Sequence, residues 1–380
     1  MIEPVDDEGV ALRPTTAVVD LGALARNVRA IRAKVGAAKI MGIVKANAYG
    51  HGLERTSKAL LDAGVDQLGV AFLEEGIRLR RAGIDAPILV LGGLIGNQIV
   101  HFIDYDLAIT AASPFKLEQI EEVAKERNKT ARVHLKVDTG MERIGIHWDS
   151  CDKLFEAALR SKHCAIEGVF SHFASSDAAD PSYTRLQLER FEEATAFFAR
   201  RSEPTPPRHI ANSGAILGHP DTYFDMVRPG LILYGVYPSP HVARSIAIEP
   251  TLSLRTRVVY FKVVRAGHPV SYDSTWAPTR DTRVVTLPVG YGDGYARRLS
   301  AHAEVLIHGA RYPIVGRITM DAMMVDIGAD GTAYNGDEVV LLGKQGDEAI
   351  AVEQLADWLD TIPYEVLTSI NTRVPRYYEA

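Results

Sequence analysis

Cysteine is scarce in this chain of 380 residues, which contains only Cys151 and Cys164. Two cysteines cannot form the disulfide framework of a small secreted protein, so the composition favours a reducing compartment and predicts a cytoplasmic location. Residues 1–10 are acidic and lack the cationic start and apolar stretch of a signal peptide, so none is expected. No run reaches the roughly 18 apolar residues of a membrane span, so no membrane association is expected either.

An excess of positive charge is also absent. The chain has 48 acidic and 42 basic residues, which give a formal net charge of −6. A nucleic-acid-binding protein would show a basic patch and a high isoelectric point, so no nucleic-acid partner is expected. The contents of 47% hydrophobic and 24% charged residues are those of an ordinary globular protein, long enough for two domains.

The first part of the chain alternates short apolar runs with amphipathic helical patterns. Apolar residues recur every three or four positions from Leu21 to Val35, which predicts a helix, and similar stretches occupy residues 114–127, 151–162 and 183–201. Strands that alternate with helices form parallel sheets, and eight of them predict a (β/α)8 barrel. The expected strands are residues 39–44, 68–71, 88–91, 107–109, 133–137, 168–170, 208–210 and 225–227.

The pattern changes near residues 237–250, where prolines interrupt it. We therefore expect an α/β chain with a TIM-like (β/α)8 barrel in residues 11–240 and a mainly β domain in residues 241–380, with residues 1–10 packing on the β domain. The elements expected in the second domain are β-rich stretches at 252–264, 282–288, 304–307, 313–316 and 339–342, a hairpin turn at 308–311 and a helix at 352–359.

A lysine follows the first predicted barrel strand, at the end of the barrel where active sites lie. An unpaired ammonium there is costly, and desolvation would make Lys45 a competent amine for Schiff-base chemistry, although a surface lysine in a loop is the alternative. Ser213 and Gly230 follow the seventh and eighth strands, where such barrels often bind phosphate, and plain turns are the alternative there. The combination describes a pocket for pyridoxal phosphate (PLP) better than most other sites.

Nine motifs, in order along nearly the whole chain, resemble those of the alanine racemase family. That family has a PLP-binding barrel followed by a β domain, which agrees with the fold expected from the sequence pattern. The motifs are VKANAYGHG at 44–52, LKVDTGMERIG at 135–145, SHFA at 171–174, NS at 212–213, RPGL at 228–231, VSYDSTW at 270–276, GYGDGY at 290–295, GRITMD at 316–321 and IPYE at 362–365.

The resemblance implies a PLP-dependent racemase that interconverts L-alanine and D-alanine, a small-molecule substrate. Lys45 would hold the cofactor and then transfer a proton on one face of the substrate, while Tyr272 would act on the other face. A lone fixed base would return the proton to the face it left, so racemisation needs two groups. In the family, the β domain of one subunit covers the barrel of the other. The resemblance therefore implies a homodimer with shared active sites, in which Tyr272 comes from the partner.

Further roles follow from the same resemblance. Arg228 would face the pyridine nitrogen, where a permanent cation disfavours protonation of the ring and hence transamination. Arg143 and Met320 would bind the substrate carboxylate, and Asp321 would lie beside the substrate pocket. Lys136 is expected to carry a carbamate, whose negative charge would hold Arg143. No metal ion is expected. With Lys45 and Arg228, the cofactor-binding set comprises Tyr49, His172, Asn212, Ser213, Gly230, Leu231 and Tyr364.

Some residues depart from the family pattern, and other activities compete with alanine racemisation. Glu142 and Asp273 stand where glycine is common, and Thr319 replaces a frequent cysteine or serine. The alternatives are a racemase for serine or basic amino acids, a fold type III PLP decarboxylase, and a non-catalytic PLP carrier. Arg228 and Tyr272 argue against the decarboxylase, which usually places an acid at the ring nitrogen and a cysteine on the opposing domain. The second domain argues against the carrier.

Overall fold

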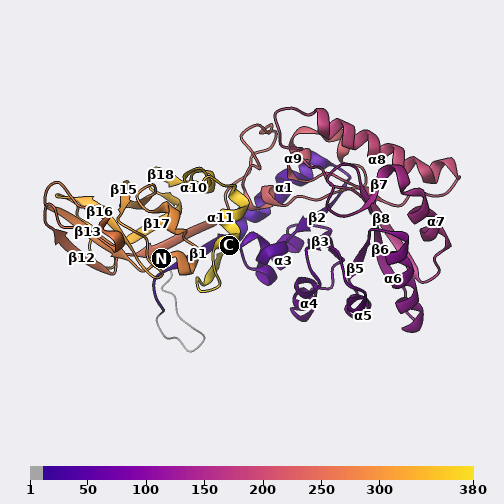
Figure 1. Cartoon of the computed structure of the whole chain (residues 1–380), viewed down its shortest axis with the longest axis horizontal. Coiled ribbons are helices and arrows are strands. Elements are labelled where there is room, and N and C mark those ends of the chain that lie inside the picture. Colours follow the sequence, from indigo (N-terminus) through magenta and orange to yellow (C-terminus); the bar gives the residue numbers. More distant parts are fainter. Residues whose placement is uncertain (1–11) are drawn as a thin grey trace. The chain divides into compact units, whose positions relative to one another are not determined.

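The computed structural model describes residues 12–380, which divide into two compact units (Figure 1). The barrel unit comprises Ala23–Ala48 and Gly52–Glu249. The β unit comprises residues 12–22, Tyr49–His51 and Pro250–Ala380. The expected packing of residues 1–10 falls outside the described residues.

Eight parallel strands form the barrel, in the order β10-β2-β3-β4-β5-β6-β8-β9. Backbone hydrogen bonds from Asp225 N to Arg208 O (3.2 Å) and from Arg228 N to Ala211 O (2.8 Å) nearly close it between the first and last strands of this order. The predicted (β/α)8 barrel is confirmed. Its strands are β2 (Lys39–Ile43), β3 (Gln67–Val70), β4 (Ile88–Val90), β5 (Ala108–Ala111), β6 (Ala131–Asp138), β8 (Cys164–Phe170), β9 (Arg208–His209) and β10 (Met226–Val227).

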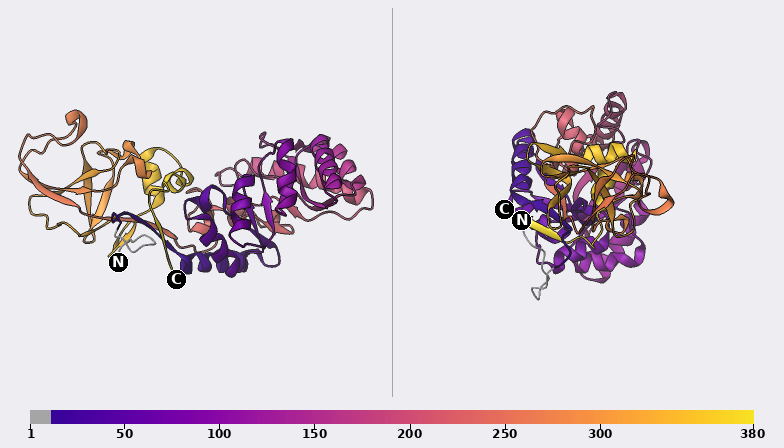
Figure 2. Two further views of the ribbon diagram at one scale, coloured as in Figure 1. Left: turned by 90° about the horizontal axis from the view of Figure 1, so that it is seen from below. Right: turned by 90° about the vertical axis from the view of Figure 1, so that its left-hand side faces the viewer.

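Amphipathic helices lie around these strands, in purple and magenta in Figures 1 and 2. Each buries one stripe, as α1 does with Leu24, Val28 and Ile31. A short strand that the sequence pattern did not reveal, β7 (Ile146–His147), pairs with β6. The helices are α1 (Leu21–Val35), α3 (Leu53–Asp62), α4 (Leu73–Arg81), α5 (Ile99–Asp104), α6 (Pro114–Glu126), α7 (Asp152–Arg160), α8 (Ser182–Arg200) and α9 (Ser213–Gly218).

The β unit is built on a sheet in the order β12-β13-β16-β15-β14-β17-β11-β1-β19, with β18 paired to β17. This confirms the expected mainly β domain, in which α10 (Val352–Leu359) and α11 (Pro363–Ser369) are the helices of more than one turn. The strands are β1 (Thr16–Asp20), β11 (Leu252–Arg257), β12 (Tyr260–Val264), β13 (Thr282–Leu287), β14 (Glu304–Ile307), β15 (Ala310–Val315), β16 (Met323–Gly328), β17 (Glu338–Gln345), β18 (Glu348–Ile350) and β19 (Arg376–Glu379).

The first strand belongs to this sheet, although the expected boundary grouped it with the barrel. β1 pairs antiparallel with β11, where Thr16 faces Arg255, and parallel with β19, where Ala17 faces Arg376. A five-residue apolar strand before a helix looks like one more βα unit in the sequence, and its true partners lie hundreds of residues away. The other division between the units falls at Glu249–Pro250 rather than at residue 240. Within residues 12–380, no helix has the length and hydrophobicity needed to cross a membrane.

Candidate active site

Lys45 lies directly beyond β2 and begins an unusual backbone turn. The four residues that follow it, Ala46 to Tyr49, have φ between 51° and 57°. Non-glycine residues lose roughly 1–2 kcal/mol each in this left-handed region, and such strain is concentrated at functional sites. Glu75 stabilises the turn by accepting a hydrogen bond from Ala46 N at 2.6 Å, and Asn47 Oδ1 accepts one from Leu53 N at 2.9 Å.

Two arginines surround the amine of Lys45. Burial lowers the pKa of Lys45 below its ordinary value, and the positive charges of Arg143 and Arg228 lower it further, while Glu75 opposes them. A half-buried lysine in this environment releases its proton more readily than a surface lysine, which is what a Schiff-base amine requires. The structure therefore supports the chemical character predicted for Lys45.

Arg228 follows β10 and is 4% exposed. Its guanidinium donates hydrogen bonds to the carbonyl oxygens of His209 (2.8 Å), Ser171 (2.8 Å) and Ile210 (3.3 Å). Burial lowers the pKa of Arg228 to about 9, so the side chain stays cationic at neutral pH. Arg228 Nη2 also lies 3.2 Å from His172 Nδ1, which must accept the hydrogen bond because arginine can only donate.

His172 is held as a neutral imidazole. Burial lowers its pKa well below the ordinary value, and the nearby charges of Arg228, Lys136, Arg143 and Lys45 lower it further. The structure thus brings five of the predicted site residues into one electrostatic environment in the barrel unit.

Lys136 is a buried lysine on β6, 7% exposed, with Nζ 4.5 Å from the centre of the Phe170 ring. Its pKa is well below the ordinary value because of burial and the charge of Arg228, with Asp138 opposing them. Within residues 12–380, its Nζ makes no hydrogen bond or ion pair. The site therefore contains an amine without an anionic partner.

Arg143 is exposed on the loop after β6, and Asp138 organises this loop. The Asp138 carboxylate accepts hydrogen bonds from the backbone amides of Gly140 (2.8 Å), Met141 (2.9 Å) and Arg143 (3.2 Å). Burial acts to raise the pKa of Asp138, but these backbone hydrogen bonds outweigh it and bring the pKa below the ordinary value. Glu142 fits the loop with φ of 53°, a conformation that glycine adopts more easily.

Ser213 and Gly230 are joined by a hydrogen bond. Ser213 Oγ accepts a hydrogen bond from Gly230 N at 3.0 Å, and its hydroxyl remains able to donate. Asn212 caps α9 by accepting from Ala215 N at 3.1 Å. Leu231 follows Gly230 in a buried helical turn.

Tyr49 and Tyr364 come together in the β unit, with ring centres 5.9 Å apart. Burial raises the pKa of Tyr49 well above its ordinary value, and Tyr364 adds to this shift, so the phenol stays a hydrogen-bond donor. The neighbouring Gly50 has φ of 83°, and a Cβ there would lie 2.1 Å from Leu367 O. This contact explains why the motif needs glycine at that position.

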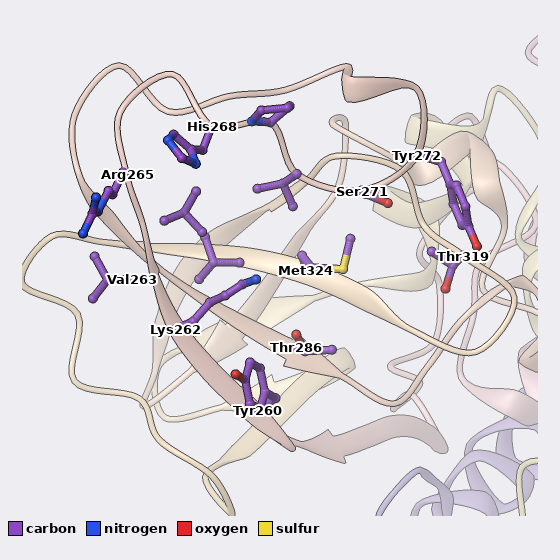
Figure 3. Close-up of a pocket in the computed structure, with 14 residues that line it drawn as sticks. Tyr260, Lys262, Val263, Arg265, His268, Ser271, Tyr272, Thr286, Thr319 and Met324 are labelled. Carbon is purple, nitrogen blue, oxygen red and sulfur yellow. The ribbon is translucent and has the colours of Figure 1, made fainter.

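Tyr272 lies on a loop of the β unit and is 69% exposed. It lines one end of a surface pocket of about 760 Å³, beside Ser271 and Thr319 (Figure 3). Lys262 and Arg265 line the other side of this pocket.

Met320 is 53% exposed, and its carbonyl accepts a hydrogen bond from Gly292 N at 3.0 Å. Its own amide has no hydrogen-bond partner in the described part of the chain, so it can bind a carboxylate. Asp321 is held by Arg373 at 2.7 Å, and Arg373 also faces the buried Asp293 at 3.7 Å.

Two buried histidines in the site were not anticipated. Arg228 Nη1 lies 3.0 Å from His209 Nδ1, and His209 Nε2 lies 2.9 Å from His134 Nδ1. Because the arginine donates, His209 must carry its proton on Nε2 and donate to His134. Burial, together with Arg132 and Arg228, lowers the pKa of His134 to about 3. The signal available in the sequence was the alternation HLKVD, which puts His134 on the same face of β6 as Lys136.

Glu75 was also missed, since its role depends on the fold around the turn after Lys45. Within the range that the structure describes, no group of three or more His, Cys, Asp and Glu side chains is placed to hold a metal ion.

Comparison with known proteins agrees with this fold. The family models described as "Alanine racemase, N-terminal domain" and "Alanine racemase, C-terminal domain" match residues 19–238 and 251–378. An alanine racemase of Symbiobacterium thermophilum is 45% identical over 367 residues, which cover 97% of each chain. The chain therefore belongs to the alanine racemase family.

Solved structures agree as well. An alanine racemase of Clostridium difficile 630 matches with a TM-score of 0.92 at 36% identity, covering 97% of this chain and 96% of that one. An alanine racemase of Bartonella henselae, determined with covalently bound pyridoxal phosphate, matches with a TM-score of 0.87 at 30% identity, covering 97% of this chain and 100% of that one.

Proposed function

We propose that this chain is a racemase that interconverts L-alanine and D-alanine with pyridoxal phosphate as its cofactor. The observation that carries the proposal is the strand-end amine of Lys45, half-buried, with its pKa lowered by burial and by Arg143 and Arg228. The relatives that match this chain over nearly its full length are alanine racemases.

The barrel unit fits the cofactor chemically. Two arginines and only one glutamate act on Lys45, so the site carries surplus positive charge for a phosphate and a substrate carboxylate. The buried Arg228 suits a position facing the ring nitrogen, and the neutral His172 suits a position against the ring. Of the residues proposed to hold the phosphate, Ser213, Gly230 and Leu231, with Asn212 supporting them, belong to the barrel unit, whereas Tyr49 and Tyr364 belong to the β unit.

When bound, pyridoxal phosphate would supply an acceptor for the electron pair that remains after the Cα proton leaves. Lys45 Nζ removes or returns that proton on one face of the substrate, and Tyr272 Oη does so on the other. Arg143 and the Met320 amide bind the substrate carboxylate. Arg228 can only donate hydrogen bonds, so it disfavours protonation of the ring nitrogen. The absence of that proton favours return of the Cα proton to the substrate.

Tyr272 is proposed to act on the barrel of a partner subunit in a homodimer. The pocket that Tyr272 lines also includes the exposed side chains of Tyr260 (56%) and Val263 (57%), and exposed apolar side chains of this size suit a protein partner. Co-expression of Lys45→Ala with Tyr272→Phe tests this arrangement. A shared-site heterodimer has one intact site, so the mixture should regain about a quarter of wild-type activity. No recovery in heterodimers would contradict the proposal.

Lys136 is proposed to carry a carbamate. Its neutral amine would add to carbon dioxide with loss of a proton, which converts a buried amine without an anionic partner into an anion beside Arg143 and Arg228. Intact-protein mass spectrometry should show one carbon dioxide adduct that is absent from Lys136→Met. An unmodified wild-type protein would contradict this assignment.

The activity is tested by proton exchange in deuterated water. With D-alanine and L-alanine, the Cα proton should be lost at rates comparable to racemisation, and serine and lysine should react far more slowly. Faster exchange of serine or lysine would identify a racemase of broader specificity, and release of carbon dioxide would identify a decarboxylase. Absence of exchange with both enantiomers of alanine, serine and lysine would refute the proposed function.

We also propose that the protein works in the cytoplasm. Cys151 and Cys164 are both free, and burial raises the pKa of each thiol to about 12. Protonated thiols are inert, which is consistent with a reducing compartment. Cell fractionation followed by immunodetection checks the location.

A further inference from the structure

Asp273, next to Tyr272, adopts a backbone conformation that favours glycine. Its φ is 62°, and the neighbouring Ser271 and Ser274 have φ of 68° and 49°. Glycine would take this conformation without steric cost, so an acidic side chain here is explained only by what the side chain contacts.

The Asp273 carboxylate bridges two arginines from separate segments. Its Oδ2 lies 3.3 Å from Arg297 Nη2 and 3.6 Å from Arg317 Nε. Arg317 Nε is buried and has no hydrogen-bond partner in the described residues, and Asp273 is the acid that compensates its charge there.

Hydrogen bonds hold the loop on the other side of Tyr272. Ser271 Oγ donates a hydrogen bond to Arg317 O at 2.6 Å, and Val270 N donates to Trp276 O at 2.9 Å to close the loop. The Tyr272 hydroxyl itself makes no hydrogen bond within residues 12–380. The orientation of the phenol therefore depends on the contacts of its neighbours.

We propose that Asp273 is a positioning residue, which holds the loop of residues 270–276 against Arg297 and Arg317 and thereby presents Tyr272 in one orientation. The inference rests on the proposed function, in which Tyr272 transfers a proton. Asp273 does not touch the reacting atoms in this assignment. It acts only through the loop.

The test compares Asp273→Asn with Asp360→Asn, a matched control in the same unit. Asp360 also has positive φ (55°) and is exposed, but its carboxylate has no ion pair in the described part of the chain. Asp273→Asn should lower kcat about tenfold while KM changes less than about twofold. In the holoenzyme, amide hydrogen exchange over residues 270–276 should accelerate about tenfold. Asp360→Asn should match the wild type in both measurements.

A double-mutant cycle separates positioning from a general structural effect. Arg317→Gln should lower kcat by a similar factor, and Asp273→Asn combined with Arg317→Gln should lower it little further, because both changes break the same contact. Fully additive losses would overturn the proposal, as would unchanged kcat and exchange in Asp273→Asn. Should that variant fail to fold, Arg297→Gln, which alters an exposed partner, provides the same comparison.

The failure of this inference is distinguishable from failure of the proposed function. A wild-type protein that racemises alanine, together with an Asp273→Asn variant that behaves like it, would refute only the role of Asp273. A wild-type protein without racemase activity would refute the function itself.

Discussion

In the barrel unit, the candidate catalytic groups lie at buried strand ends, where Lys136 and Arg228 are 7% and 4% exposed. In the β unit, Tyr272 and Met320 lie on loops and are 69% and 53% exposed. Burial shifts the pKa values of the barrel groups, whereas ion pairs and backbone turns organise the β-unit loops. The barrel groups are therefore desolvated within one chain, whereas the β-unit loops leave Tyr272 and Met320 exposed.

Replacing the barrel amine should give the largest effect. Lys45→Ala should lower kcat/KM for both alanine enantiomers by about 10⁴-fold or more, because it removes the covalent attachment point and one proton-transfer group. Lys39→Ala, at the exposed start of the same strand, is the control and should keep wild-type activity. Polarimetric assays check both variants, and a racemisation rate in Lys45→Ala close to that of Lys39→Ala would contradict the assignment.

The loop phenol should matter for activity but not for stability. Tyr272→Phe should lower kcat about 10³-fold through loss of one acid–base group. The free energy of unfolding should change by less than about 0.5 kcal/mol, because the hydroxyl is exposed and makes no hydrogen bond in the described residues. Kinetic assays and chemical denaturation test the two expectations, and a large loss of stability would show that the loop is not an independent surface element.

Arginines in the two units should differ in their contribution to stability. Arg228→Gln leaves buried carbonyl oxygens of Ser171 and Ile210 without donors and should lower the free energy of unfolding by about 3 kcal/mol. Arg297→Gln breaks an exposed ion pair and should change it by less than about 0.5 kcal/mol. Urea denaturation measures the free energy of unfolding of both variants. Equal losses would show that arginines in the two units contribute equally to stability.

A further effect should appear as a pH dependence of stability. The folded protein excludes a proton from His134 down to a pKa of about 3, whereas the unfolded chain binds one below about 6.5. The contribution of His134 to the free energy of unfolding should therefore be fully present above pH 6.5. It should fall by about 1.4 kcal/mol per pH unit as the pH decreases toward 3. His134→Gln should reduce this slope, and the exposed His241→Gln should not. Denaturation curves of the wild type and both variants between pH 4 and 7 measure this slope. An equal slope in His134→Gln and the wild type would contradict the prediction.

The sequence pattern was sufficient for the barrel strands and the long helices. Apolar runs and periodic stripes are local signals, and α8 begins and ends within one residue of the expected 183–201. The partners of β1 could not be found this way, because pairing with β19 depends on register across the whole chain. Residues 252–264 form two strands rather than one, interrupted at Val258 and Val259.

For the candidate site, residue types at strand ends were predictable and the buried network was not. His134 and His209 lie on strands either side of β8 and meet over Gly168. A Cβ at that glycine would lie 2.5 Å from His134 Nδ1, so the contact exists only because a side chain is missing. A single sequence shows the glycine but not which side chains meet above it. The motif resemblance likewise named Tyr272 and Asp273 without revealing that Arg297 and Arg317 secure the loop.

The position of β1 between β11 and β19 also has a consequence for biosynthesis. Residues 16–20 are made more than 350 residues before one of their partners, residues 376–379. At a translation rate of about 5–20 residues per second, this strand waits tens of seconds for that neighbour. Its exposed edge during this interval is a natural target for a chaperone, and completion of the sheet must wait for residues 376–379.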